Sequence, residues 1–139
     1  MSTRFENARR LTSQLVGATY TSGLDVSREA GRLCAQLGQR ALLVRDPFPG
    51  GAPFLDKVIA SLGHASVEIV DEIDGAPPNA PREAVSRIAE CIMKTRPNVL
   101  VSFGGGSTID AVKAASIVQA LGGSMDDYLE FEGGYAMAR

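Results

Sequence analysis

The sequence predicts an α/β fold in which a mostly parallel β-sheet carries helices on both of its faces. Three short apolar runs have the β-branched or aromatic content of buried strands and end at turn residues: ALLV at 41–44, VEIV at 67–70 and VLVSF at 99–103. Segments with helical periodicity fill the intervals between these runs. Strands that alternate with helices form βα units, whose strands lie parallel in one sheet that helices cover.

Apolar side chains that recur at helical spacing predict the helices. The first helix has Asp25 as its N-cap and ends at Gly38, and its apolar face comprises Val26, Ala30, Leu33, Cys34 and Leu37. The second ends at Gly63, and its face comprises Phe54, Val58, Ile59 and Leu62. The third is closed by Pro97, and its face comprises Val85, Ile88, Ala89 and Ile92.

The last predicted helix runs from about Ser107 to Leu121 and is nearly apolar all round. Such a helix is expected to pack deep against the sheet, and its alanines allow a close approach. A weaker apolar run, LVGATY at 15–20, predicts either a further strand or an extended segment that leads into the sheet.

Length and composition limit what the chain can be. Its 139 residues suffice for one domain with a hydrophobic core, and 45% apolar with 22% charged residues argue against disorder. The net charge of −2 and the scattered basic residues give no reason to expect nucleic acid as a partner. No apolar stretch reaches the roughly 20 residues of a membrane span, and the N-terminus lacks the apolar core of a secretory signal. We therefore expect a cytoplasmic protein without a membrane partner.

The few potential metal ligands exclude one kind of site. A catalytic zinc or iron site usually takes two or three histidines together with carboxylates or thiolates. His64 is the single histidine and is expected in a surface turn just past a helix end. Cys34 and Cys91 lack CxxC spacing and are expected as small buried hydrophobic side chains without a disulfide. The chain is therefore predicted to bind no metal ion.

The residues after the third predicted strand carry the clearest functional signal. Gly104, Gly105 and Gly106 follow VLVSF directly, and a long helix begins at once. Glycine permits φ > 0, so successive N–H groups can converge on an anion, and the missing side chains let a phosphate reach the backbone at the helix N-terminus. Because ligands of open α/β sheets bind at the carboxyl ends of the strands, this loop is predicted to bind phosphate. A flexible strand–helix turn without a ligand is the alternative.

Polar residues around this loop suggest further roles. Ser107 and Asp110 fit the S-x-x-D pattern of a helix start, so Ser107 is expected to cap the helix or to give its hydroxyl to a phosphate. Asp110 and Lys113 lie one turn apart and can pair. At the ends of other strands, Asp46 is placed to accept a hydrogen bond from a ribose 2′-hydroxyl, and Asn79 offers a donor and an acceptor. Both of these residues also fit plain turns.

Together these motifs resemble the iron-containing, group III alcohol dehydrogenases, whose relatives include glycerol dehydrogenase and dehydroquinate synthase. The N-terminal domain of that family has V-x-D at a strand end, then a P-N-P-like loop, then G-G-G-S-x-x-D-x-x-K. This chain has LVRD at 43–46, PPNAP at 77–81 and GGGSTIDAVK at 104–113, in the same order and at similar spacing. The resemblance covers residues 15–130 approximately and implies a Rossmann-like fold, as in the N-terminal domain of dehydroquinate synthase.

The resemblance also implies which residues bind the cofactor, which is expected to be NAD, with NADP less favoured. The residues assigned to this site are Asp46, Asn79, Gly104, Gly105, Gly106, Ser107 and Asp110. Among them the two later glycines and the serine bind the pyrophosphate, Asp46 the adenosine ribose, and Asn79 lies beside the adenosine half. Asp110 and Lys113 shape the loop and the helix. Ala80 stands where the family often has proline, which weakens the assignment of Asn79.

The metal-binding half of that family has no counterpart in these 139 residues. Family members bind iron or zinc in a C-terminal helical domain and transfer hydride between nicotinamide and an alcohol or carbonyl substrate in the cleft between domains. We therefore interpret residues 1–139 as an N-terminal NAD(P)-binding domain that is inactive alone. A maleylacetate reductase or glycerol dehydrogenase type, and a stand-alone nucleotide- or phosphate-binding module, are the alternatives, and a homodimer is compatible with each.

Overall fold

A computed structural model describes residues 3–16, 21, 23–123 and 128 of the chain. Its elements in chain order are α1 (Arg4–Val16), the 3₁₀ helix η2 (Val26–Glu29), α2 (Ala30–Ala35), β1 (Arg40–Arg45), α3 (Ala52–His64), β2 (Glu68–Asp74), α4 (Arg82–Thr95), β3 (Val99–Phe103) and α5 (Gly106–Leu121). From β1 onward, strands and helices alternate as the predicted α/β fold requires.

The three strands form a parallel sheet in the order β2-β1-β3. The central strand β1 places Leu42 opposite Leu100 of β3 and opposite Asp71 of β2. All three predicted strands are confirmed, although β2 starts at Glu68 and continues to Asp74, past the apolar run that predicted it. This extension is polar because β2 lies at an edge of the sheet, where alternate side chains reach water.

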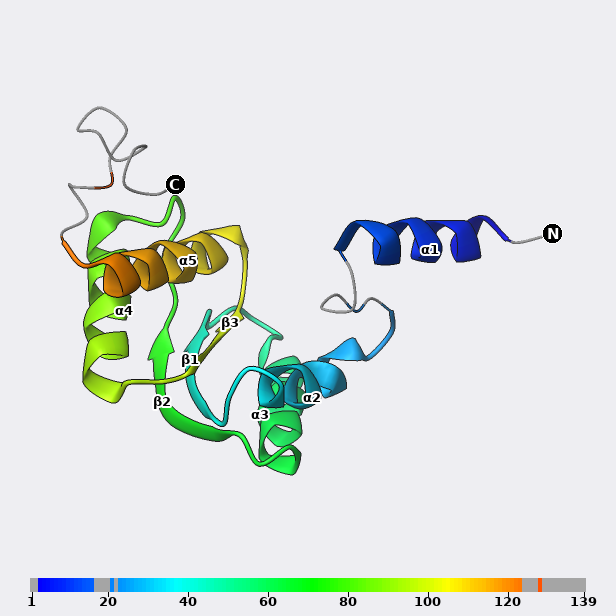
Figure 1. Ribbon diagram of the computed structural model, residues 1–139, viewed down its shortest axis with the longest axis horizontal. Coiled ribbons are helices and arrows are strands. Elements are labelled where there is room, and N and C mark those ends of the chain that lie inside the picture. The colour runs from blue at the N-terminus through cyan, green and yellow to red at the C-terminus, as the bar shows by residue number, and fades with distance from the viewer. Residues whose placement is uncertain (1–2, 17–20, 22, 124–127, 129–139) are drawn as a thin grey trace.

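Helices cover both faces of the sheet, as predicted (Figure 1). On one face, Ala41 of β1 packs with Val58 and Leu62 of α3. Val67, just before β2, and Val99 of β3 complete this cluster. On the other face, Leu42 and Val44 pack with side chains of α4 and α5: Ala84, Val85, Ile88, Ile92, Ala111, Val112 and Ala115. Because side chains alternate along a strand, β1 contributes to both cores. The fold is the expected Rossmann-like arrangement.

Helices α3 and α4 largely follow their predicted apolar faces. In α4 most of the predicted face is buried, and the helix ends at Thr95, just before Pro97. In α3 the later part of the predicted stripe packs on the sheet, but Phe54 is 54% exposed. Phe54 lies in the first turn of α3, and its ring centroid lies 5.6 Å from the Lys57 ammonium. The prediction that Phe54 joins the core is therefore wrong.

The segment before β1 departs most from its prediction. Asp25 stands at the N-cap position of η2, as predicted, but its backbone is left-handed with φ 58° and its side chain makes no capping hydrogen bond. Its carboxylate instead pairs with Arg28 and with Lys57 of α3. The single predicted helix is divided into η2 and a short α2 that ends before Gly38. Leu37 is 76% exposed because it follows the end of α2 and does not face the sheet.

Helix α5 starts at Gly106 and ends at Leu121, close to the predicted bounds. Its buried face comprises Thr108, Ala111, Val112 and Ala115. Ile117 and Leu121 are 41% and 58% exposed, so this apolar helix packs less deeply against the sheet than predicted. In the described part of the chain, α5 packs on α4 and the sheet with one side only.

Smaller sequence predictions can also be placed. Cys34 and Cys91 are free thiols and partly buried. His64 is exposed, but it is the last residue of α3 and not a turn residue past the helix. Of the run at 15–20, the first two residues belong to α1, and 17–20 lie outside the described residues. None of the described helices combines the length and hydrophobicity that crossing a membrane requires.

Candidate functional site

A groove of about 470 Å³ opens at the carboxyl ends of the three strands. Its walls are residues 46–48 after β1, 74–78 at the end of β2, and 105–107 after β3. The loops that follow parallel strands gather at one edge of the sheet, which brings these distant segments together. The groove lies where the sequence predicts a ligand.

The three glycines after β3 have different roles. Gly104 has φ 159°, and a Cβ there would lie 2.1 Å from a carboxylate oxygen of Asp46, so only glycine fits. A Cβ on Gly105 would come no nearer than 3.8 Å to that oxygen, and one on Gly106 would meet nothing within 4 Å. Gly105 has φ −79°, so the positive φ expected for this loop is confined to Gly104. The two later glycines instead keep the backbone open to the groove.

Backbone donors at the start of α5 are unused. The N–H groups of Gly106 and Ser107 have no hydrogen-bond partner among the described residues, because the first turn of a helix supplies none. The helix is 16 residues long, so its aligned peptide dipoles place a partial positive charge at this end, equivalent to about half a unit charge. An anionic group in the groove would meet both the charge and the open donors.

Asp46 stabilises the glycine loop directly. Its Oδ2 accepts the N–H of Gly105 at 2.8 Å, and its Oδ1 accepts the hydroxyl of Thr108. Asp46 therefore holds the start of α5, a task that the sequence assigned to Ser107. Its side chain also lines the groove, and each carboxylate oxygen has a further lone pair that a ligand can use.

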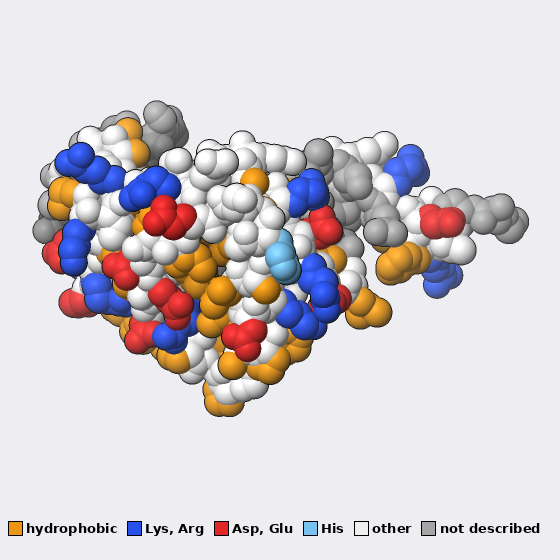
Figure 2. All heavy atoms as spheres, turned by 90° about the horizontal axis from the view of Figure 1, so that it is seen from below, with side chains coloured by type: hydrophobic (Ala, Val, Ile, Leu, Met, Phe, Trp, Pro, Cys, Tyr) orange, Lys and Arg blue, Asp and Glu red, His pale blue; other side chains and the backbone are white. Residues whose placement is uncertain are grey.

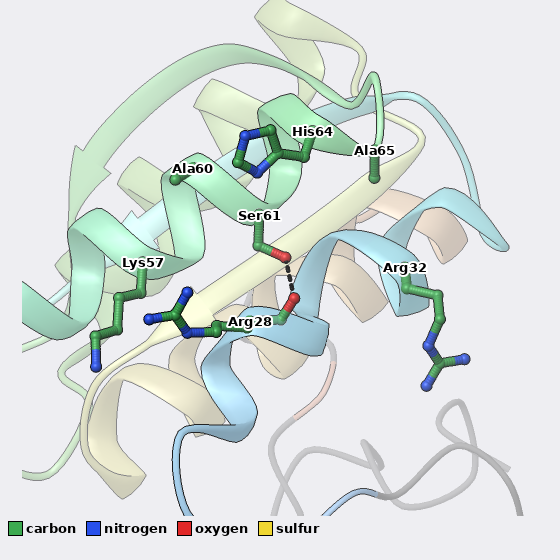
Figure 3. Close-up of a pocket in the computed structure, with 7 residues that line it drawn as sticks. All are labelled: Arg28, Arg32, Lys57, Ala60, Ser61, His64 and Ala65. Atoms are coloured by element: carbon green, nitrogen blue, oxygen red, sulfur yellow. Dashed lines mark hydrogen bonds between the residues drawn. The ribbon is translucent and has the colours of Figure 1, made fainter.

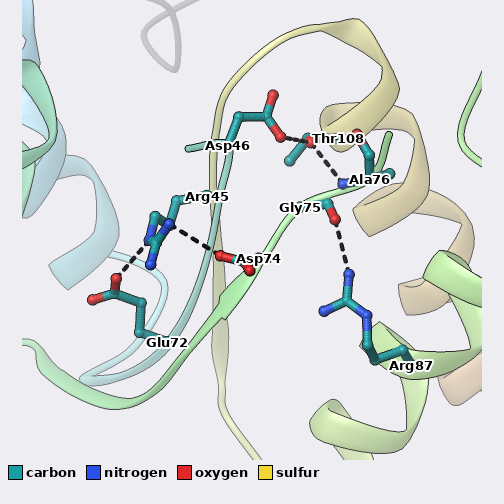
Figure 4. A network of polar contacts seen from close by, with 8 residues as sticks. All are labelled: Arg45, Asp46, Glu72, Asp74, Gly75, Ala76, Arg87 and Thr108. Carbon is teal, nitrogen blue, oxygen red and sulfur yellow. Dashed lines mark hydrogen bonds and ion pairs between the residues drawn. The ribbon is translucent and has the colours of Figure 1, made fainter. Parts of the chain in front are cut away.

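Thr108 joins the ends of all three strands, and its role is not evident from the sequence (Figure 4). It is fully buried on α5, which follows β3, and its hydroxyl donates to Asp46 after β1. The same hydroxyl accepts the N–H of Ala76, after β2, at 2.9 Å. Because this buried hydroxyl both donates and accepts a hydrogen bond, it fixes the loops relative to one another. The sequence offers one signal for this role: Thr108 lies in the first turn of a predicted helix, on the face that packs against the sheet.

Ser107 lines the groove, and Asn79, which is not among the groove's lining residues, contacts it. The Ser107 hydroxyl oxygen accepts the N–H of Asn79 at 3.2 Å, and α5 has no side-chain cap. The capping role predicted for Ser107 is therefore wrong, while its role toward a phosphate stays a prediction. Asn79 has φ 70°, a conformation that asparagine tolerates better than most residues. Asp110 and Lys113 pair at 4.0 Å on an exposed side of α5, a geometry that contributes little.

A second carboxylate borders the groove at the end of β2. Arg45 pairs with Glu72 at 2.7 Å and with Asp74 at 3.0 Å (Figure 4). The hydrogen bond to Glu72 is the main reason why the pKa of the Arg45 guanidinium lies above its usual value. Asp74 is the member of this network that lines the groove. The groove thus carries two carboxylates, of which Asp46 contacts the start of α5 and Asp74 is paired with Arg45.

The motifs around the groove are those of a known family. A family model described as iron-containing alcohol dehydrogenase matches residues 18–137, most of the chain. The chain belongs to this family. The resemblance inferred from LVRD, PPNAP and GGGSTIDAVK is thereby confirmed.

Several iron-containing alcohol dehydrogenase relatives are much longer than this chain. It is 31% identical over 134 residues to a choline dehydrogenase of Bacillus subtilis, covering 96% of this chain and 33% of that protein. It is 38% identical over 81 residues to an NADPH-dependent butanol dehydrogenase of Clostridium saccharobutylicum, covering 55% and 20%. It is 27% identical over 119 residues to an NAD-dependent methanol dehydrogenase of Bacillus methanolicus, covering 85% and 31%. The chain thus spans a third or less of their lengths.

A solved structure shares the fold. The crystal structure of a mutant of an archaeal halo-thermophilic Red Sea brine pool alcohol dehydrogenase matches with a TM-score of 0.66 and 28% identity. The match covers 74% of this chain and 27% of that one. The predicted fold class, a parallel sheet flanked by helices as in the N-terminal domain of iron-containing alcohol dehydrogenases, is confirmed.

The described residues of this iron-containing alcohol dehydrogenase chain do not fit an iron ion. No cluster of three or more His, Cys, Asp or Glu side chains suited to a metal occurs among them. His64 lies at the end of α3 and does not line the groove. The groove offers backbone amides and carboxylates, which suit a polar organic ligand and lack the imidazole groups of a family metal site.

Proposed function

We propose that this chain is the NAD(P)-binding portion of an alcohol dehydrogenase-type oxidoreductase and that the groove holds the dinucleotide. The observation that carries the proposal is the start of α5, where open glycine backbone and unused N–H groups border the groove. A pyrophosphate has the charge that such a helix N-terminus binds. Membership of the family supports the same interpretation.

Each part of the groove suits one part of the cofactor. The pyrophosphate lies against the backbone of residues 105–107. Asp46 accepts the adenosine ribose hydroxyl, and Asn79 lies beside the adenosine half. Gly104 is packed on Asp46, and Asp110 points to solvent, so these two act by shaping the loop and the helix start.

The acidic lining predicts that NAD(H) is preferred over NADP(H). A carboxylate accepts a hydrogen bond from the ribose 2′-hydroxyl, whereas it repels a 2′-phosphate. Asp46 and Asp74 both line the groove and lie at neighbouring strand ends. One relative is named NADPH-dependent and another NAD-dependent, so family membership leaves the cofactor open and these carboxylates carry the prediction.

The proposed chemistry of a complete enzyme is reversible hydride transfer between nicotinamide and an alcohol, giving an aldehyde or ketone. The family's metal would supply polarisation of the substrate oxygen. The residues of this chain bind and orient the cofactor. We expect the purified chain to bind NADH and not to oxidise alcohols.

Fluorescence titrations with NADH and NADPH test the proposal. Wild type is expected to bind NADH at least about tenfold more tightly than NADPH, a difference of ~1.4 kcal/mol. Asp46→Gly should remove most of this preference because it removes the carboxylate. Thr108→Val is the matched control: it removes the hydroxyl that holds Asp46 and keeps the charge, so it should weaken both cofactors alike.

The outcomes separate two claims. Equal affinity of wild type for NADH and NADPH would show that Asp46 does not select the ribose. Absence of saturable binding of either cofactor to the folded chain would contradict the proposed function itself.

A further inference from the structure

A second hollow, of about 410 Å³, lies between α3 and the segment formed by η2 and α2 (Figure 3). None of its described lining residues also lines the groove at the strand ends. The helices touch closely beside it, since a Cβ on Gly31 would lie 1.9 Å from the Ser61 carbonyl oxygen. The side chains between its charged residues are small: Ala60, Ser61 and Ala65. Its volume falls within the roughly 300–1,000 Å³ of small-molecule sites.

Basic side chains surround this hollow. Arg28 and Arg32 come from η2 and α2, and Lys57 and His64 come from α3. No Asp or Glu is among its described lining residues. Lys57 and His64 are seven positions apart, which places both on one face of α3. Figure 2 shows Lys and Arg side chains close to the single histidine, on a chain whose net charge is −2.

Two neighbouring carboxylates orient these cations and leave most of their donors unused. Asp25 accepts Nε of Arg28 and Nζ of Lys57, the latter at 2.6 Å, and Glu29 accepts Nε of Arg32 at 2.7 Å. The hydrogen bonds from Lys57 and from Arg28 hold the pKa of Asp25 below its usual value. The Nη groups of both arginines have no partner within the described chain. The three cations Arg28, Arg32 and Lys57 exceed the two carboxylates by one positive charge.

We infer that this basic hollow binds a phosphate group, either as free phosphate or as part of a phosphate ester. A guanidinium with free Nη groups matches two oxygens of an oxyanion. In Figure 3 the side chains of Arg28, Lys57 and His64 lie around Ser61, so donors reach the hollow from both helices. Among its described lining residues there is no Phe, Tyr, Trp or large aliphatic side chain, so charge is the main attraction that it offers. The inference is independent of the NAD(P) groove.

The single histidine makes a specific test possible. His64 gives the only imidazole proton signals of the chain, and it lines the basic hollow. Sodium phosphate should shift these NMR signals along a saturating curve at constant pH and ionic strength, and sodium chloride should not. Arg28→Gln should weaken the apparent affinity at least about tenfold. The control Lys94→Gln removes the same charge from α4, on the opposite face of the sheet, and should leave the curve unchanged.

Titrations with further ligands show whether the bound phosphate is free or part of an ester. Adenosine monophosphate that binds more tightly than inorganic phosphate would support an ester, and equal affinity would support free phosphate. Circular dichroism verifies the fold of Arg28→Gln, and Arg32→Gln replaces it if that variant unfolds. A linear, unsaturated shift, an unchanged curve in the arginine variants, or an equal shift with adenosine alone would overturn the inference.

Discussion

The amino ends and the carboxyl ends of the three strands differ in how their polar groups are paired. At the amino ends, the polar groups are paired within the chain: Asn98 Oδ1 accepts the N–H of Arg40 at 2.8 Å, and the Asn98 N–H donates to the Arg40 carbonyl at 2.9 Å. The Arg40 guanidinium pairs with Glu68 at 3.4 Å and donates to the Thr95 carbonyl at 3.2 Å. A Cβ on Gly38 would lie 2.3 Å from the Asn98 amide oxygen, so the segment before β1 packs closely against the segment before β3.

The carboxyl ends leave both room and donors. The groove opens there, and the amides of Gly106 and Ser107 have no partner among the residues that the structure describes. Because the amino ends anchor the strands, the opposite loops can stay open without loss of the sheet. Changes at the amino ends should therefore affect stability, and changes at the carboxyl ends should affect binding.

Gly105→Val should have the largest effect on binding. The side chain would project into the space where the pyrophosphate meets the backbone, so NADH affinity should fall at least about 100-fold, or ~2.7 kcal/mol. The fold should persist, because Gly105 has an ordinary φ and no neighbour within 3.8 Å of the new Cβ. NADH fluorescence and circular dichroism on the same samples measure both quantities. Normal NADH binding by the folded variant would mean that the loop is only a turn.

Thr108→Val should affect both stability and binding, because Thr108 connects the loops. Valine has a similar shape but leaves the Asp46 carboxylate and the Ala76 N–H without their buried partner. We expect the free energy of unfolding to fall by about 1–3 kcal/mol in urea titrations. An unchanged unfolding midpoint would show that the hydroxyl does not hold the strand ends together.

Asn98→Ala should affect stability alone. It removes the oxygen that accepts the Arg40 N–H, at an exposed site, so the free energy of unfolding should fall by about 1 kcal/mol. NADH affinity should equal that of wild type. If affinity falls together with stability, the two ends of the sheet are not independent.

Ser107→Ala should have the smallest effect. Its hydroxyl does not cap α5, so the free energy of unfolding should change by less than about 0.5 kcal/mol, and NADH affinity should fall by the ~1 kcal/mol of one hydrogen bond. Thermal unfolding and NADH titration separate the two quantities. A loss of stability larger than the loss of affinity would restore the capping role.

The sequence predicts the strands, and it places the glycine loop at the groove, for a physical reason. Runs such as ALLV are buried on both faces, and only buried parallel strands combine that composition with flanking helices. The triple glycine is equally informative because a loop without side chains after a strand requires a ligand or close packing. Close packing applies at Gly104, while Gly105 and Gly106 leave the backbone open to the groove, where a ligand stays a prediction.

The sequence does not predict how the polar side chains choose their partners. Asp25 and Ser107 both fit helix-capping patterns, yet each binds a group that is distant in the chain: Lys57 for Asp25 and Asn79 for Ser107. Asp46 and Thr108 meet across 62 positions, and no local pattern encodes that contact. Tertiary proximity decides these pairs, and it exists only once the strand ends have come together.

The most direct test of the account is to map NADH binding with backbone amide NMR signals of the whole chain. The account predicts saturable shifts for Gly105, Gly106 and Ser107 and for loop residues after β1 and β2. Signals of Arg40 and Asn98 at the amino ends should stay unchanged. Saturable shifts confined to the amino ends or to the basic hollow around His64, or no saturable shifts at all, would contradict a dinucleotide site at the carboxyl ends of the sheet.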